Sequence, residues 1–191
     1  MIPVSPVPFW QYFDLITLSI LLSVTAVLVM AQRKSTGKLL GTISQSVAHT
    51  KRSSLIFSIF MTICYPLYYA FVWLWVGPLV DAPTIFYYLL AGSALCEMVF
   101  VWVPATTGMS HKIHAAMAYV VGVEMFVFPV IILLYGQNVS SFAQASIIFF
   151  LVTGCALLSL MIFKKLRTYT FLYETIYSVV FLLTVSIIAH S

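Results

Sequence analysis

Six long apolar stretches dominate this chain and decide which solvent surrounds it. Each stretch is close to the ~20 residues that a helix needs to cross the hydrocarbon core of a bilayer. Because no water satisfies backbone groups at that depth, we expect every stretch to be an α-helix; membrane-spanning β-strands would be shorter and would alternate polar with apolar residues. The predicted helices cover approximately residues 13–31, 54–76, 83–103, 113–135, 141–163 and 169–189.

The composition supports a membrane protein. Only 7% of the 191 residues are charged and 62% are hydrophobic, whereas a soluble domain carries about 25% charged residues. Nothing in the chain suggests a second domain. The predicted fold is therefore all-α: a polytopic membrane protein in which residues 1–191 form a single bundle of six transmembrane helices.

The positions of the basic residues predict the orientation of the bundle. All nine Lys and Arg residues fall in the first, third and fifth loops. By the positive-inside rule, the odd-numbered loops are cytoplasmic and both termini lie on the non-cytoplasmic side. Because these residues form short clusters without an extended basic face, we do not expect nucleic-acid binding.

The first predicted loop, residues 32–53, is long and basic. Its cations either remain solvated or bind the headgroups of anionic membrane lipids, and Leu39, Leu40 and Ile43 within it are candidates for an amphipathic turn on the inner membrane surface. The candidate headgroup-binding residues are Arg33, Lys34, Lys38, Lys51 and Arg52.

Three carboxylates lie inside predicted spans, where ionisable groups are costly and usually functional. At the 1.5 Å rise of an α-helix, Glu97 and Glu174 lie roughly 9 Å and 8 Å from the cytoplasmic ends of their helices, and Glu124 lies roughly 17 Å in, near the midplane. We therefore predict that Glu97, Glu124 and Glu174 are linked to protons or cations. The alternative is that protonated or paired carboxyls only fix helix packing, because a neutral carboxyl costs far less to bury than a charge.

Two histidines at the start of the fourth predicted helix raise a second possibility. His111 and His114 are three residues apart and share one helical face, so together with Glu97 or Glu174 they are candidate ligands for Zn²⁺ or another transition metal. The alternative is that both histidines anchor the helix at the membrane interface. No cofactor is required by any other motif in the chain.

Small residues predict which face of the fourth helix is buried, and prolines predict space between the helices. Ala118 and Gly122 continue the histidine face, and such small residues allow another helix to approach, so this face should point into the bundle. Pro66 and Pro129 lie inside predicted helices and are expected to kink them. The three tyrosines near Pro66 are candidates to line a cavity: Tyr65, Tyr68 and Tyr69.

Three short segments of the sequence occur in order along the chain. They are Gly41-Thr42-Ile43-Ser44-Gln45, then Val103-Pro104-Ala105-Thr106-Thr107-Gly108 followed by His111 and His114-Ala115-Ala116-Met117-Ala118, and Tyr173-Glu174-Thr175-Ile176-Tyr177. These segments resemble parts of the six-helix DRAM-like families and their prokaryotic relatives of unknown function. The resemblance implies a six-helix bundle with lipid or membrane-stress association, and it carries over no catalytic residue. That family is drawn with a cytoplasmic N-terminus, whereas the charges here place it outside.

Three classes of function are consistent with these features. The first is a small transporter, or a lipid- or ion-handling protein, that uses the intramembrane carboxylates; we rank it first because carboxylates at graded depths suit a relay. The second is an intramembrane metal-dependent enzyme with its site near the cytoplasmic face. The third is a structural or scaffolding subunit. The sequence leaves open whether the protein is an enzyme, and a bundle this small is also a candidate homo-oligomer.

Overall fold

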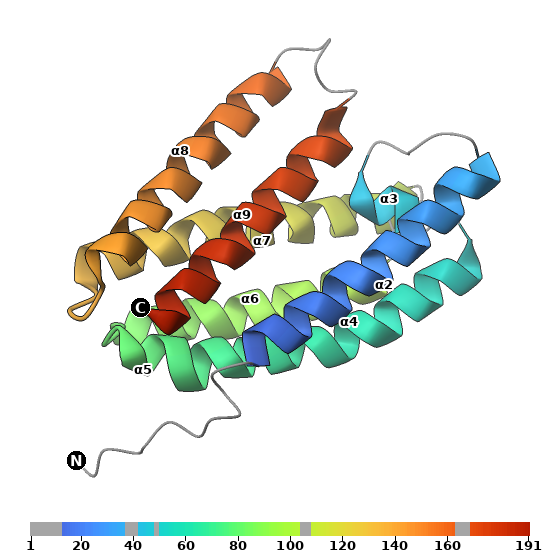
Figure 1. Cartoon of the computed structure of the whole chain (residues 1–191). Helices are drawn as coiled ribbons and strands as arrows, with labels where there is room; N and C mark the ends of the chain where they lie inside the picture. The colour runs from blue at the N-terminus through green and yellow to red at the C-terminus, as the bar shows by residue number, and fades with distance from the viewer. Residues whose placement is uncertain (1–12, 37–41, 48–49, 104–107, 163–168) are drawn as a thin grey trace.

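The computed structural model describes residues 13–36, 42–47, 50–103, 108–162 and 169–191. Every regular element within these ranges is a helix, so the all-α prediction is confirmed (Figure 1). The elements are α2 (Phe13–Thr36), α3 (Ile43–Val47), α4 (Lys51–Phe71), η1 (Val72–Val76), α5 (Gly77–Leu79), α6 (Thr84–Trp102), α7 (Gly108–Tyr135), α8 (Ser141–Ile162) and α9 (Thr170–His190).

Five stretches of helix are long and apolar enough to cross a membrane. They indicate a multi-pass integral membrane protein, as the composition predicts. The first predicted segment, residues 13–31, is also helical, since it lies within α2, which continues to Thr36. The five candidate spans are Lys51–Leu79, Thr84–Trp102, Met109–Tyr135, Ser141–Leu160 and Thr170–His190.

The second predicted helix extends further than the sequence suggests. Gly77 and Pro78 were expected to open a loop, but α4 continues through the π-helical turn η1 into α5. In η1 the Gly77 N–H donates to the Val72 carbonyl, five residues back. Pro78 has no N–H to donate to a helical hydrogen bond, and the wider π turn before it lets the helix continue through this position.

This continuous helix ends at Leu79, and two residues later Asp81 has a left-handed backbone with φ of 51°. The Asp81 N–H donates to the Pro78 carbonyl and the Ala82 N–H to the Gly77 carbonyl, at 3.3 and 2.9 Å. This is the Schellman arrangement, which satisfies the last carbonyls of a helix. Asp is one of the few non-glycine residues that tolerate this conformation.

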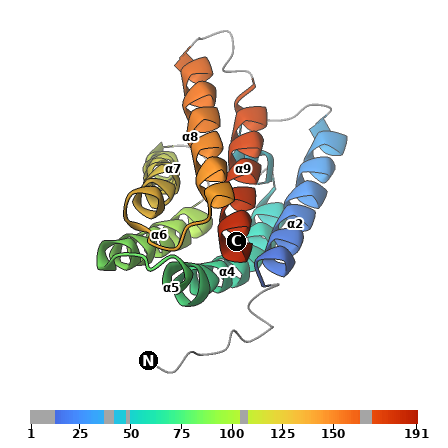
Figure 2. The ribbon, with the colours of Figure 1, turned by 60° about the vertical axis from the view of Figure 1, so that its left-hand side comes forward.

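The long helices form a closed ring. α2 packs against α4, α4 against α6, α6 against α7, α7 against α8, and α8 against α9, while contacts between α9 and α2 complete the ring (Figure 2). The short helix α3 packs against α2, α4 and α9. It therefore lies at one end of the ring, beside the end of α2 and the start of α4 (Figure 1).

The described basic residues gather at that same end of the bundle. They are exposed, and they lie at the end of α2 and the starts of α4 and α7. We call this end the basic end. The first residue of α2 and the last residue of α9 lie toward the opposite end (Figure 1). The residues that define the basic end are Arg33, Lys34, Lys51, Arg52 and Lys112.

Polar side chains join helices that are far apart in the sequence. The Ser58 hydroxyl donates to the Val101 carbonyl at 2.8 Å, which ties α4 to α6. The Trp75 indole donates to the Ala189 carbonyl at 3.0 Å, which ties η1 to α9. Because lipid is as apolar as the side chains, such bonds and close packing hold membrane bundles together.

Gly154 on α8 shows how tight this packing is. A Cβ atom there would lie 2.5 Å from the ring of Phe126 and 3.1 Å from the ring of Tyr177. The Phe126 ring cannot retreat easily, because its centroid is 5.5 Å from that of Phe150 and 5.3 Å from that of Tyr177. Gly122 on α7 differs, since a Cβ there would meet no atom within 4 Å.

We expect Gly154→Ala to lower the free energy of unfolding by about 1–3 kcal/mol, the usual cost of overpacking. Gly122→Ala is the matched control, and it should not destabilise the protein because the added methyl has room. Thermal unfolding of both purified variants in one detergent measures the difference. Equal stability of the two variants would contradict the packing described for α8.

Candidate functional site

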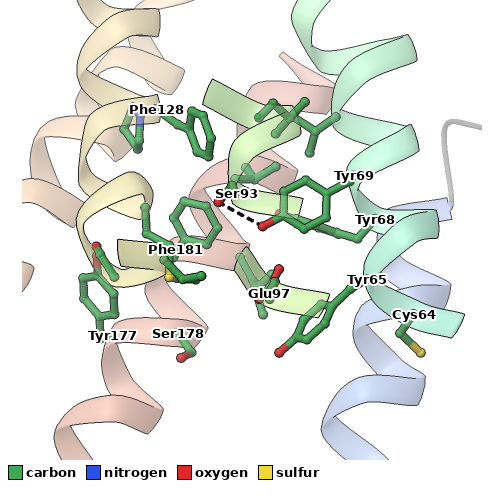
Figure 3. A pocket seen from close by; sticks show the side chains of 18 of the residues that line it. Cys64, Tyr65, Tyr68, Tyr69, Ser93, Glu97, Phe128, Tyr177, Ser178 and Phe181 are labelled. Carbon is green, nitrogen blue, oxygen red and sulfur yellow. Dashed lines mark hydrogen bonds between the residues drawn. The ribbon is translucent and has the colours of Figure 1, made fainter. Parts of the chain in front are cut away.

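A cavity of about 340 Å³ occupies the centre of the helical ring. Side chains from α4, η1, α6, α7 and α9 line it, and Ile43 of α3 contributes to its wall (Figure 3). Tyr65, Tyr68 and Tyr69 all line this cavity, as expected from their place beside Pro66. Ala118 and Gly122 of the predicted small-residue face line it too.

The polar groups of the cavity wall lie in the half nearer the basic end, among apolar side chains such as Phe57 and Phe100. They are carboxyl and hydroxyl groups, including those of Glu97, Glu174 and Ser178. Toward the opposite end the lining side chains are hydrocarbon. That apolar part is lined by Val72, Val76, Phe86, Leu90, Phe128, Pro129, Ile132, Phe181, Leu182, Val185 and Ile188.

Glu97 is the central polar group of the cavity. Glu97 and Ser93 lie one turn apart on α6, and Tyr65 and Tyr69 lie one turn apart on the facing side of α4 (Figure 3). The Tyr69 hydroxyl donates to the Ser93 hydroxyl oxygen at 3.1 Å. Both tyrosine hydroxyls also interact with the Glu97 carboxyl. Because the two residues of each pair are four positions apart, all four side chains form one polar cluster between α4 and α6.

Glu174 joins the cavity to the short helix α3. Its Oε2 accepts the backbone N–H of Ile43 at 2.8 Å, across 131 residues of sequence. The Thr42 hydroxyl oxygen accepts the Gln45 N–H at 3.1 Å, so two otherwise unpaired donors at the start of α3 are satisfied. The interaction holds Ile43 in the cavity wall. The position of this turn on the inner membrane surface stays a prediction. Leu39 and Leu40 lie outside the described residues.

Glu124 lies apart from the cavity wall, between α7 and α6. A Cβ on Gly92 of α6 would be 3.9 Å from its Oε1. Its Oε2 is buried and makes no hydrogen bond within the described part of the chain. A charge on Glu124 would nevertheless act on Glu97. The three predicted carboxyls therefore lie in three different settings, two of them on the cavity.

The two histidines also differ in their surroundings. His114 is buried, its Nδ1 lies 2.6 Å from the Val103 carbonyl oxygen, and its ring centroid lies 4.3 Å from that of Phe100. His111 is exposed. Because α7 starts at Gly108, earlier than residue 113, both histidines belong to its first two turns.

The geometry adds no support for the metal site. Among the described residues, no three or more His, Cys, Asp or Glu side chains form a group that could hold a metal ion. A metal site formed by His111, His114 and Glu97 or Glu174 stays a prediction from the sequence.

The basic residues of the first loop that the structure describes are all exposed. Arg33 and Lys34 end α2, and Lys51 and Arg52 begin α4. Lys38 lies outside the described residues. These positions leave the cations available to lipid headgroups, and headgroup binding stays a prediction.

Comparison of the chain with protein families, curated proteins and solved structures gave no match. The resemblance to DRAM-like families therefore stays a prediction, and the function has to be argued from the cavity.

Proposed function

We propose that this protein is a small membrane transporter that binds an amphipathic small molecule in its central cavity. In this proposal, Glu97, Glu124 and Glu174 are the proton- or cation-linked groups. The observation that carries the proposal is the Glu97 carboxyl, enclosed with hydroxyl groups in a cavity whose other walls are mostly apolar.

This combination is typical of a small-molecule site. Such sites measure roughly 300–1,000 Å³ and pair apolar and aromatic walls with a few polar groups. The cavity meets both criteria, at the lower end of the range. Glu97 interacts with the tyrosine hydroxyls of α4, as a packing carboxyl would, but it also lines the cavity, where a ligand can reach it (Figure 3).

The other two carboxyls supply different parts of a transport device. Glu124 is close enough to influence Glu97 electrostatically, and its buried Oε2 has no hydrogen bond in the described structure. Glu174 holds α3 at the basic end of the cavity. In this proposal Glu97 binds the ligand, Glu124 responds to the charge at Glu97, and Glu174 holds α3 over the end of the cavity.

The proposal includes six membrane spans with both termini on the non-cytoplasmic side. The clustering of the described basic residues at one end supports this orientation. The length of α2, 24 residues, supports its role as a sixth span. In this orientation the cations of the first loop face the inner leaflet, where they bind anionic headgroups.

Charge displacement in reconstituted vesicles tests the transport function. Vesicles on a solid-supported membrane are exposed to pulses of small amphipathic compounds, grouped by charge, at two pH values. We expect wild-type vesicles to displace charge with one class of compound and Glu124→Gln vesicles to lose the pH dependence. Asp81→Asn, which removes an exposed carboxylate, should behave like wild type. Because exchange of a monovalent cation for one proton moves no net charge, the pH inside the vesicles is followed with an entrapped dye in parallel. Folded protein that neither displaces charge nor moves protons with any class of compound would refute the proposal.

A further inference from the structure

We infer that the ligand of the cavity is a small organic cation, an amine or ammonium group carried on an apolar body. The cationic group lies against Glu97 and the body fills the apolar part of the cavity. This inference rests on the proposed function, because it names the substrate class of the same cavity.

The charged side chains of the described cavity wall all have the same sign. Among the lining residues that the structure describes, Glu97 and Glu174 are acidic and none is Lys, Arg or His. Glu174 already accepts a backbone N–H, and Glu97 meets hydroxyl groups. All Lys and Arg side chains in the described part of the chain are exposed at the basic end.

A charged carboxylate inside a bilayer is stable only when it is paired and hydrogen-bonded. The Tyr65 hydroxyl supplies a hydrogen bond to Glu97. The single Tyr69 hydroxyl proton is donated to Ser93, and none of these hydroxyls supplies a positive charge. A cationic ligand would complete the pair, whereas an anionic ligand would be repelled by both carboxyls. A bare metal ion fits less well, because the described residues offer no group of three or more acidic, His or Cys ligands.

Aromatic rings around the carboxyl favour an organic cation over a neutral molecule. The rings of Tyr65 and Tyr69 lie beside Glu97, and Phe181 lies across the cavity on α9 (Figure 3). The face of an aromatic ring attracts an ammonium group within about 6 Å, and the attraction strengthens where water is excluded. A carboxylate combined with aromatic walls is therefore a site for an amine.

The rest of the wall defines the body of the ligand. Beyond Ser93 the cavity continues between hydrocarbon side chains such as Leu90, Val76 and Ile188. A second polar group on the ligand would lose its water there without gaining a partner. The ligand class is therefore a monoamine with a compact hydrocarbon or aromatic body.

A matched pair of compounds tests this inference. Phenylpropylamine and phenylpropanol share a body and differ in charge, and their binding to wild-type protein in nanodiscs is measured by titration and by the shift in unfolding temperature. We expect the amine to bind at least about tenfold more tightly than the alcohol. Glu97→Gln should remove that preference and leave alcohol binding unchanged, while Asp81→Asn should retain it.

The outcomes separate this inference from the proposed function. Equal binding of the amine and the alcohol to wild type would overturn the amine assignment and leave a ligand-binding cavity. Absence of binding by either compound to folded protein, with the long-chain amine octadecylamine also inactive, would overturn both. Binding of octadecylamine alone would support a lipid amine as the source of the cation, and binding of phenylpropylamine would support a free amine. If Glu97→Gln fails to fold, the comparison of amine and alcohol binding to wild-type protein still tests the amine assignment.

Discussion

A phenylalanine at position 122 should abolish ligand binding and leave the protein folded. Gly122 lines the cavity from α7, and a Cβ there would meet no atom within 4 Å. The larger side chain therefore enters open space and occupies the volume that the ligand needs. We expect affinity for any cavity ligand to fall by more than about a hundredfold, which corresponds to about 2.7 kcal/mol of binding free energy.

We expect a small cost of overpacking, because the Cβ of the new side chain has room. The unfolding temperature of Gly122→Phe should therefore stay close to that of wild type, since the ring also buries apolar area. Gly122→Ala serves as the size control and should retain binding. Full ligand affinity in Gly122→Phe would mean that the ligand binds somewhere other than this cavity.

Replacing Glu174 with leucine should open the cavity at the basic end. The substitution removes the acceptor of the Ile43 N–H, and a hydrogen bond to a charged group contributes about 1.5–3 kcal/mol. Loss of this bond weakens the attachment of α3, so the open population should rise on the order of tenfold or more. Glu174→Gln keeps an acceptor oxygen and should stay close to wild type.

A cysteine at position 178 reports the opening. Ser178 lines the cavity one turn beyond Glu174 (Figure 3), and alanines at Cys64, Cys96 and Cys155 remove the native thiols. The labelling rate with a membrane-impermeant maleimide should increase about tenfold in Glu174→Leu. In the proposed orientation, labelling occurs in inside-out vesicles and not in right-side-out vesicles. An identical rate in Glu174→Leu and Glu174→Gln would show that the bond to Ile43 does not hold the cavity closed.

The helices of this fold can be predicted from the sequence because the length of an apolar stretch in lipid leaves few alternatives. The same rise per residue places Glu97 and Glu174 at similar depths, and both line one cavity in the structure. The tyrosines near Pro66 and the small-residue face of α7 were also identifiable, because helical periodicity shows which residues share a face.

Other parts of the site depend on contacts that no local pattern encodes. The bond between Glu174 and Ile43 joins residues 131 positions apart. Gly77 and Pro78 look like a loop, yet the π turn before them lets the helix continue. For Glu124 the depth could be estimated from the sequence, but its position beside Gly92 depends on how α6 and α7 are rotated against each other.

The polarity change along the cavity has a consequence for how a bound molecule leaves. In the proposed binding mode, a cation at Glu97 lies in the half of the cavity nearer α3, and hydrocarbon side chains such as Leu90 and Val76 lie between it and the opposite end. A ligand that leaves past α3 moves its charged group first, so the charge regains water at the start of the movement. A ligand that leaves at the opposite end moves its apolar body first. Its charged group then has to pass between hydrocarbon side chains without water, where an unpaired charge is least stable. The two exits therefore present unequal barriers, and the higher one falls only when the helices around the apolar part separate enough to admit water.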